Sequence, residues 1–408
     1  MLRLFYHLDG SRIHSFEYTY DDSGNRITMV DTPANTANAV AWKYNYDWLD
    51  RLVQVEKGAN LGSTSVVRLY GYDESDNRIS VDMQDLMTPE LHTFAYDNAD
   101  QLSSRSVTIG MGSPALVESF SHDNDGNMIA RVLDPSGTPA TTNYFWDDFD
   151  RLAAVEKPDG TTVNVYDSGN LRKKKVRDDG VKLKSFYSGL PTVSEVDGSD
   201  AFSYLMGHQL LGFQKGSDYF YFLTDGLSSV RVMVKASNGA TSNFLHDEWG
   251  VKDPSSDSDS PKTYVGGLGV HDDTADTGLL YMRQRHYDPT LARFLSKDKV
   301  ANLNRYAYAG NKPVEFVDPS GLIPGRDAGE MVIPWADQPS AEQYVQGQKA
   351  AAVFGLGFLP VVGEAMAVAD FVGAPGLLTG LGAAISVIPG GVNLARGARA
   401  ARSAEVGG

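Results

Sequence analysis

Residues 16–30 read FEYTYDDSGNRITMV, and the pattern of these residues predicts the fold. Its first five residues alternate aromatic with polar side chains, which is typical of a half-buried β-strand. The DDSGN that follows is rich in Asp, Gly and Asn, which tolerate positive φ or hydrogen-bond their own backbone and so favour turns. Residues 26–30, RITMV, supply a second strand. The stretch therefore predicts a β-hairpin, which is poorly stable alone and needs neighbours.

The same pattern recurs along the first part of the chain. A pair formed by an aromatic residue or histidine and an aspartate returns at intervals of about 20 to 26 residues, each time before a turn and an apolar residue. The turn alternates between a longer form, DDSGNRI at 21–27, and a shorter form, DWLDRL at 47–52. This spacing predicts a doublet of about 50 residues, and stacked hairpins would bury one continuous aromatic face. The aspartates of the pairs are Asp21, Asp47, Asp73, Asp97, Asp123, Asp147 and Asp167.

The repeated side chains each have a structural and a functional interpretation. We expect each aspartate to cap backbone N–H groups of the turn that follows it, because short acidic side chains bond the backbone two residues on. Binding of a metal or substrate is the alternative. The tyrosines could stack on sugars, but aromatic ladders more often pack a sheet.

Composition narrows the function classes. The chain has 408 residues, of which 42% are hydrophobic and 22% charged, so most of it should fold, with room for more than one domain. The net charge of -16 argues against nucleic-acid binding through this region, and the basic run at 172–177 is interpreted as a solvated strand face. The chain has no cysteine, and its eight histidines show no metal-ligand spacing. We therefore expect no metal and no cofactor.

The first nine residues, MLRLFYHLD, contain no long apolar run and no small-residue cleavage site, so no signal peptide is predicted. They look like the middle of a repeat.

The Tyr-Asp-x-x-Gly-Asn-Arg pattern and its shorter Asp-Arg-Leu form resemble the YD repeat of RHS proteins. These include bacterial Rhs and wall-associated toxins, the C subunits of Tc complexes, and teneurins. The resemblance covers roughly residues 14 to 322 and implies a mainly β fold, in which hairpins coil into a hollow shell closed by a core. It divides the chain into repeats at 1–199, transition strands at 200–275, an RHS-associated core module at 276–322, and a C-terminal segment at 323–408.

The core module carries the most specific motifs, DTGLLYMRQRHYDPTLARFLSKD at 276–298 and NRYAYAGNKPVEFVDPSGL at 304–322. In many bacterial relatives this core is a self-cleaving aspartyl protease, so the resemblance implies a cut between Leu322 and Ile323. The matching carboxylates are Asp298 and Asp318, with Asp288 and Arg293 close by in sequence.

In such a site one carboxylate acts as base and the other as acid, and a neighbouring arginine keeps one of them ionised. The sequence departs from the family at Ala292, where a glycine is usual, and at Lys299, where a proline is usual. That the aspartates only cap turns around Pro289 and Pro319 is the alternative.

The C-terminal segment changes composition to a Pro-containing linker and then an apolar, Ala- and Gly-rich stretch, for which we expect a small α-helical unit. LPVVGEA at 359–365 and LTG at 378–380 resemble a pre-toxin module that follows RHS cores. Contact of residues 350–395 with a membrane is the competing interpretation, which the helix breakers and acidic residues disfavour.

The resemblance implies a function as the encapsulating shell and autoprocessing core of a polymorphic toxin, used in bacterial competition or host attack. The expected partners are the chain's own C-terminal effector segment, an immunity protein and secretion-system components, and the expected location is secreted or on the cell surface. The alternative is a non-cleaving surface or secreted repeat protein that binds carbohydrate or other cells.

Overall fold

The structure is a computed structural model, and it describes residues 2–8, 11–112, 114–134, 139–188, 191–257, 260–300, 303–322, 324–325 and 385–389. It confirms the mainly β class. Strands β1 to β22 form one antiparallel meander, in which each strand pairs with the next along the chain. The first half of the meander consists of β1 Leu2–Leu8, β2 Ser11–Tyr20, β3 Arg26–Pro33, β4 Val40–Tyr46, β5 Leu52–Gly58, β6 Ser65–Tyr72, β7 Arg78–Met83, β8 Glu90–Tyr96, β9 Leu102–Ile109, β10 Pro114–His122 and β11 Met128–Leu133.

The second half consists of β12 Ala140–Trp146, β13 Leu152–Lys157, β14 Gly160–Tyr166, β15 Arg172–Val176, β16 Lys182–Tyr187, β17 Thr192–Asp197, β18 Asp200–Met206, β19 Leu210–Lys215, β20 Asp218–Thr224, β21 Val230–Lys235 and β22 Thr241–Asn243. Short 3-10 turns stand at Thr36–Asn38, Gly266–Leu268 and Ala309–Asn311.

The aromatic residue of most pairs has a structural role that the register explains. Between β4 and β5 the register shifts at Asn45/Tyr46, a β-bulge at the end of the hairpin, and equivalent shifts occur in the other hairpins. A bulge takes backbone groups out of the regular ladder. The Tyr72 hydroxyl donates to the carbonyl of Leu52, which opens β5, at 2.8 Å. The corresponding bonds are made by Tyr46, Tyr96, Trp146 and Tyr166, each to the first residue of the strand after the preceding turn.

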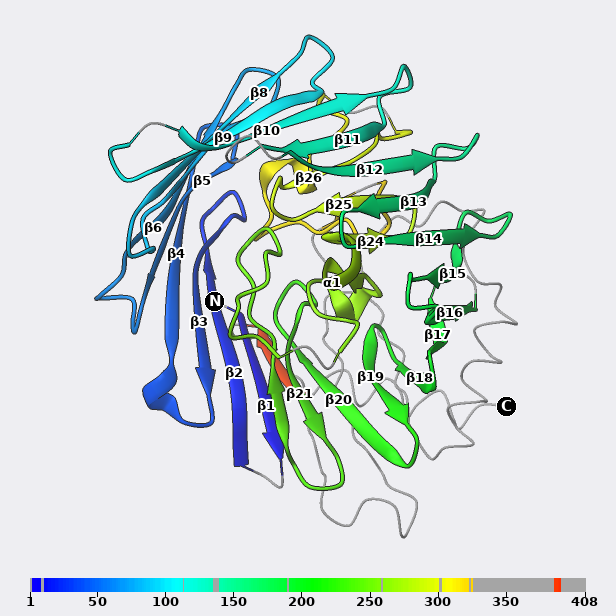
Figure 1. Ribbon diagram of the computed structural model, residues 1–408. Helices are drawn as coiled ribbons and strands as arrows, with labels where there is room; N and C mark the ends of the chain where they lie inside the picture. The colour runs from blue at the N-terminus through cyan, green and yellow to red at the C-terminus, as the bar shows by residue number, and fades with distance from the viewer. Residues whose placement is uncertain are drawn as a thin grey trace, which may run out of the picture.

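The sheet curves until its two ends meet, as Figure 1 shows, with β1 and β2 close to β20 and β21 around a central module. The Tyr6 hydroxyl on β1 donates to the carbonyl of Thr224 at 2.6 Å. On β2, the Tyr18 hydroxyl accepts the N–H of Gly226 at 2.7 Å. These two buried contacts join segments more than 200 residues apart in the chain, so side-chain hydrogen bonds hold the two ends of the meander together and close the wall.

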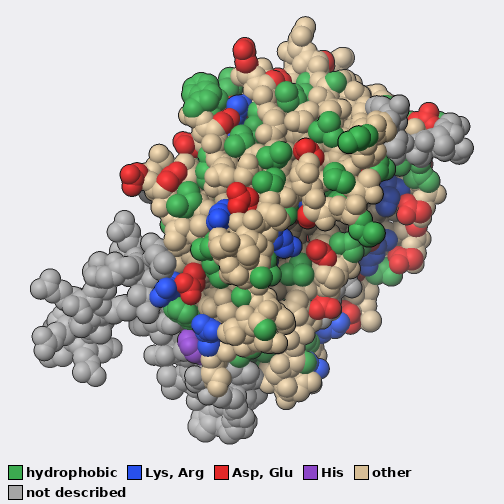
Figure 2. Space-filling model, turned by 90° about the vertical axis from the view of Figure 1, so that its left-hand side faces the viewer, with side chains coloured by type: hydrophobic (Ala, Val, Ile, Leu, Met, Phe, Trp, Pro, Cys, Tyr) green, Lys and Arg blue, Asp and Glu red, His purple; other side chains and the backbone are tan. Residues whose placement is uncertain are grey.

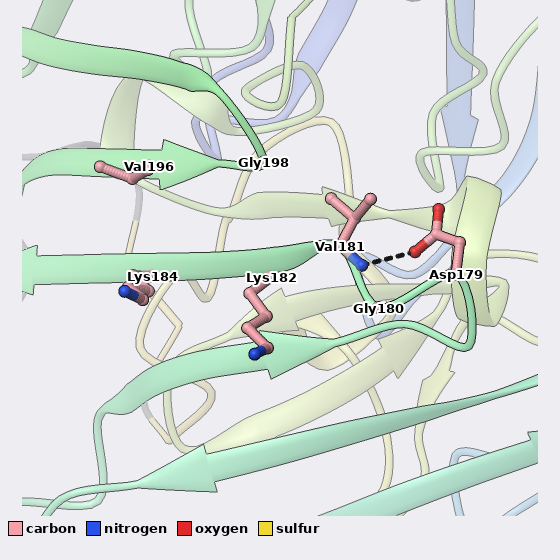
Figure 3. A pocket seen from close by; sticks show the side chains of 7 residues that line it. All are labelled: Asp179, Gly180, Val181, Lys182, Lys184, Val196 and Gly198. Atoms are coloured by element: carbon pink, nitrogen blue, oxygen red, sulfur yellow. Dashed lines mark hydrogen bonds between the residues drawn. The ribbon is translucent and has the colours of Figure 1, made fainter.

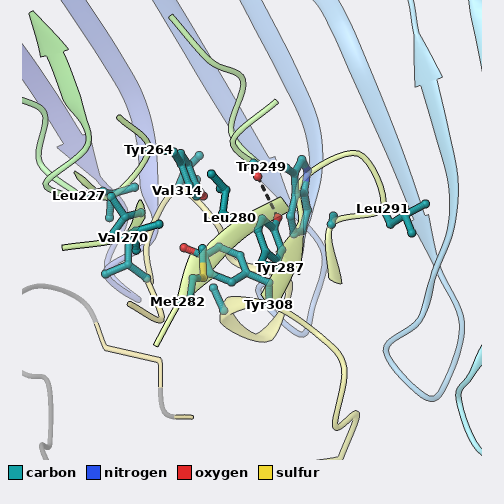
Figure 4. Packing of buried hydrophobic residues seen from close by; sticks show 14 of the residues in the cluster. Leu227, Trp249, Tyr264, Val270, Leu280, Met282, Tyr287, Leu291, Tyr308 and Val314 are labelled. Carbon is teal, nitrogen blue, oxygen red and sulfur yellow. Dashed lines mark hydrogen bonds between the residues drawn. The ribbon is translucent and has the colours of Figure 1, made fainter. Parts of the chain in front are cut away.

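Inside this wall lies the predicted core module. A four-stranded sheet with one short helix begins in the predicted transition strands, five residues before this module, and continues into it as β23 His271–Asp273, α1 Thr274–Thr277, β24 Leu279–Met282, β25 Arg285–Asp288 and β26 Arg293–Phe294. Its side chains and the inward side chains of the shell form one hydrophobic cluster. In Figure 4, Tyr287 and Tyr308 pack beside Trp249, and the Tyr287 hydroxyl donates to the Trp249 carbonyl at 2.9 Å. Burial of large aromatic groups from both parts stabilises the core module within the shell.

The outer face of the shell carries a mixed set of side chains. In the view of Figure 2, acidic, basic and apolar groups are interspersed. Among the residues that the structure describes, no helix is both long and apolar enough to pass through a membrane.

Most of the C-terminal segment, including residues 350–384 and Ile323, lies outside the described residues. The exceptions are Pro324, Gly325 and β27, Ile385–Pro389, which pairs antiparallel with β1. These five residues are a strand, so the predicted helix was wrong for them. Their sequence, ISVIP, is rich in β-branched residues, and an edge strand offers free backbone groups for pairing.

Candidate functional site

The aspartates of the repeated pairs cap their turns. Oδ1 of Asp73 accepts the backbone N–H of Ser75 and of Asn77, at 3.0 and 2.8 Å, and Oδ2 accepts the Asn77 side chain at 3.0 Å. Asp21, Asp47, Asp97, Asp123, Asp147 and Asp167 accept N–H groups two and four residues on in the same way. The carboxylate oxygens are thereby used within the turn.

The turns also bond one another in a ladder along the edge of the sheet. Asn25 donates to Asp50 in the next turn at 2.9 Å, and Arg51 donates to Asp76 in the turn after that at 2.8 Å. The third residue after each aspartate has positive φ, such as 60° at Asp50 and 62° at Asp76. This backbone conformation explains why Gly, Asp or Asn occupies the position.

Within the core, one guanidinium nitrogen bridges two buried carboxylates. Nη2 of Arg285, on β25, donates to Oδ2 of Asp298 at 2.8 Å and to Oδ2 of Asp318 at 3.2 Å. The three residues are 4%, 2% and 1% exposed, respectively. A charge-assisted bond of this kind is strong in a buried setting and holds both carboxylates beside one positive charge.

The two carboxylates have different surroundings. Burial raises the pKa of Asp298, and the nearby Asp318 also raises it, while Arg285 opposes both effects. A buried acid with a raised pKa keeps its proton more readily than one in water. Asp318, by contrast, accepts the Leu322 N–H and the Ser320 hydroxyl through Oδ1, both at 3.0 Å.

The chain after Asp318 folds back onto the carboxylate pair. Val317 and Gly325 form an antiparallel bridge, which brings the chain after Asp318 back beside Val317. Nε of Arg285 donates to the carbonyl of Gly321, directly before Leu322. Gly321 has a φ of 70°, and a Cβ there would lie 2.6 Å from the Met282 carbonyl oxygen. Glycine is therefore required for the loop to approach β24 and β25 so closely.

Asp288 and Arg293 lie in the core but contact the shell instead of the carboxylate pair. Asp288 accepts the N–H groups of Thr290 and Leu291 through Oδ1 and pairs with Arg131 of β11 through Oδ2 at 3.1 Å. Arg293 donates to the carbonyl of Asp100 at 2.6 Å. Its guanidinium stacks on the rings of Tyr96 and Tyr306.

Sequence reasoning missed three residues of these motifs. It did not single out Arg285, because nothing in the local sequence distinguishes this arginine from its neighbours Arg283 and Arg293. It also missed Asp225 and Asp247, which cap turns as the repeat aspartates do. For Asp247 a signal existed, because a histidine precedes it, as in the pair that contains Asp123.

A separate hollow of about 370 Å³ lies at the turn before β16 and beside β17. Figure 3 shows its lining, with Lys182 and Lys184 on one side and Asp179, which accepts the Val181 N–H, on another. None of the predicted site residues lines it.

The sequence is similar to parts of several curated proteins. The curated relatives include the tRNA3(Ser)-specific nuclease WapA of Bacillus spizizenii, 29% identical over 174 residues, which is 39% of this chain and 7% of that protein. The tRNA nuclease WapA of Bacillus subtilis is 32% identical over 98 residues, 22% of this chain and 4% of that protein. The Salivary gland surface protein 1 of Aedes aegypti is 30% identical over 117 residues, 28% of this chain and 3% of that protein. The chain thus spans only a small share of the length of these relatives.

Among solved structures, TcdB2-TccC3-TEV matches 78% of this chain and 20% of its own, at 17% identity and a TM-score of 0.37. TcdB2-TccC3 without its hypervariable C-terminal region matches the same shares at 16% identity and a TM-score of 0.37. The family model described as Teneurin YD-shell matches residues 3–314, from the first strand into the core module. By this match the chain, an RHS/YD-repeat protein, belongs to the Teneurin YD-shell family.

Proposed function

We propose that this chain is the encapsulating shell and self-processing core of a toxin, and that it cuts its own backbone between Leu322 and Ile323. The observation that carries the proposal is the pair of buried carboxylates bridged by Arg285. The loop that leads to the proposed cut is bonded to the same site, through the Leu322 N–H on Asp318 and the Gly321 carbonyl on Arg285.

The two carboxylates suit the two roles that peptide hydrolysis needs. Asp318 takes a proton from water as the water oxygen attacks the Leu322 carbonyl carbon, and Asp298 gives its proton to the carbonyl oxygen. The resulting diol then collapses. The C–N bond breaks, the Ile323 nitrogen takes the proton from Asp318, and Asp298 recovers its own proton. The products are a Leu322 carboxyl group and an Ile323 amine.

Asp288 and Arg293 contribute by holding the core against the shell. Their bonds to β11 and to the turn at Asp100 seat the segment that carries the carboxylates. In this proposal the metal-free chemistry is supplied by Asp298 and Asp318 alone.

The closed wall supports the rest of the proposal. We assign residues 1–199 to repeats, 200–275 to transition strands, 276–322 to the core, and 323–408 to a linker and pre-toxin-like segment that leads into an effector. The names of two curated relatives describe them as tRNA nucleases. The effector segment is the first partner of the shell, and an immunity protein and secretion components complete an exported toxin system. Carbohydrate binding by the tyrosine ladder is not favoured, because hydroxyls such as that of Tyr72 are bonded inside the sheet.

The test is the intact mass of residues 1–408 after purification and denaturation. We expect two fragments, the second beginning at Ile323, and a single uncut chain in Asp318→Asn and in Asp298→Asn. Asp167→Asn is the matched control, because Asp167 caps a turn in the repeats, and it should leave cleavage intact. An uncut wild-type chain would refute self-processing and leave a structural repeat protein.

A further inference from the structure

Asn304 joins the core module to a turn of the shell. Its Nδ2 donates to the carbonyl of Ser75 at 3.1 Å and to Oδ1 of Asn77 at 2.6 Å. Its Oδ1 accepts the backbone N–H of Tyr306 and of Ala307 at 3.0 and 3.2 Å. The side chain is 7% exposed, so it makes these bonds inside the protein. One amide therefore fixes the local backbone and docks it on the shell.

The residue that receives this bond is a member of the turn ladder. Nδ2 of Asn77 donates to the carboxylates of Asp73 and Asp100 at 3.0 and 2.8 Å. These two bonds use both donors of the amide and leave its oxygen as the acceptor for Asn304. The contact therefore requires that the shell turn at 73–78 has formed and that its neighbour is in place.

The next residue, Arg305, is bonded to the carboxylate site through both its backbone carbonyl and its guanidinium. Its carbonyl accepts the backbone N–H of Asp298 at 2.8 Å and Nη1 of Arg285 at 3.1 Å. Its own Nε donates to the carbonyl of Asp298 at 2.8 Å. The position of the Asp298 carboxylate relative to Arg285 thus depends on where the backbone at 304–306 is held.

A second shell contact holds the other end of the same segment. The Tyr306 hydroxyl donates to the carbonyl of Gly126 at 2.8 Å, in a turn that lies two hairpins further along the meander from the turn at 73–78. The Tyr306 carbonyl accepts the N–H of Phe294 on β26 at 3.0 Å. Residues 304–306 are therefore bonded to two shell turns and to the core sheet.

From these contacts we infer that Asn304 is a positioning residue for the Asp298 and Asp318 pair, and that the turn at 73–78 completes the cleavage site. The inference rests on the proposed self-processing and adds that formation of the shell controls when the chain cuts itself. The carboxylates adopt their bridged arrangement only when the core is seated on a finished shell, so a chain with an unfinished wall does not cut. Such coupling would keep the C-terminal segment attached until the shell has closed around it.

The experiment compares Asn304→Asp with Asn311→Asp in the full chain. Both changes replace an amide donor by a carboxylate oxygen of the same shape. Nδ2 of Asn311 donates to the carbonyl of Asp76, in the same shell turn, at 2.8 Å, but among the described residues none of the bonds of Asn311 reaches Arg285, Asp298 or Asp318. Its φ of 62° is one that aspartate tolerates. The control therefore removes an equivalent shell contact without touching the segment that holds Asp298.

The first readout is the rate at which the fragment beginning at Ile323 appears after refolding. Asn304→Asp should cut at least about tenfold more slowly, because a small misplacement of catalytic groups is costly, while Asn311→Asp stays within about twofold of wild type. The second readout is hydrogen exchange of the peptide 295–307 in chains made uncut by Asp318→Asn. The Asp298 amide should exchange about tenfold faster with Asn304→Asp and be unchanged with Asn311→Asp.

Equal cutting and equal exchange in the two variants would overturn the positioning role, even if the wild type cuts. An uncut wild type would instead refute the self-processing proposal. The exchange readout would still decide whether Asn304 holds the Asp298 backbone, so the two failures are distinguishable.

Discussion

Replacing Tyr72 with phenylalanine removes one hydroxyl and keeps the ring, so it isolates the bond that the repeat makes at its bulge. The hydroxyl donates to the Leu52 carbonyl at 2.8 Å, and Leu52 is fully buried. The ring packing and the Arg51 guanidinium that lies 4.8 Å from the ring centroid remain in the variant. The loss is therefore one hydrogen bond plus the cost of leaving a buried carbonyl without its partner, about 1.5 kcal/mol in free energy of unfolding.

The assay is urea denaturation followed by fluorescence, in which the midpoint should fall while the slope is unchanged. Tyr20→Phe is the matched control. Tyr20 is 37% exposed, and its hydroxyl makes no described hydrogen bond, so its loss should cost less than about 0.5 kcal/mol. The reasoning would be refuted by a Tyr72 variant as stable as wild type, or by two variants that are destabilised equally.

Three further outcomes follow from single sites. Gly321→Ala should lower the free energy of unfolding by about 3 kcal/mol and abolish the cut, because alanine would be forced to positive φ against a backbone oxygen 2.6 Å away. Cutting at the wild-type rate in an intact-mass assay would contradict this. Burial lowers the pKa of His286 to about 3, so the unfolded chain binds its proton from pH 6.5 downward and the folded chain does not. Between pH 6.5 and 4, the free energy of unfolding of the wild type should thus fall by about 3 kcal/mol because of this histidine. Urea titrations at the two pH values should show that His286→Phe lacks this loss. Equal losses in both proteins would exclude the mechanism. Asp76→Val should lower the free energy of unfolding by about 2 kcal/mol more than Asp76→Gly does, because φ is 62° at this position. Similar urea midpoints for the two variants would show that backbone conformation does not select this residue.

The repeat could be predicted because its decisive contacts are local. An aspartate such as Asp73 bonds N–H groups only two and four residues away, and the third residue after it needs positive φ whatever the rest of the chain does. Period-two aromatic strands then leave one buried face, which stacked hairpins cover. At 385–389, by contrast, pairing with β1, a partner distant in sequence, decided the structure of a short apolar run in the segment for which a small α-helical unit was expected.

The carboxylate site was predicted in part. Asp298 and Asp318 stand in motifs that the sequence displays, but the arginine between them is Arg285, 33 residues before Asp318 in the chain, and not Arg293. Both arginines lie in the core segment, and the choice between them depends on which strand of a four-stranded sheet faces the loop.

The β-hairpin repeat and its turn chemistry were predictable because they depend on contacts within a few residues, and the candidate acids were predictable from the resemblance of their motifs to those of a known family. Which groups meet across the closed wall depends on the three-dimensional arrangement of distant segments. Asn304 bonds Ser75 across 229 residues of sequence, and Arg131 pairs with Asp288 across 157. No local pattern encodes such pairs, because they exist only after the meander has curved far enough to enclose the core.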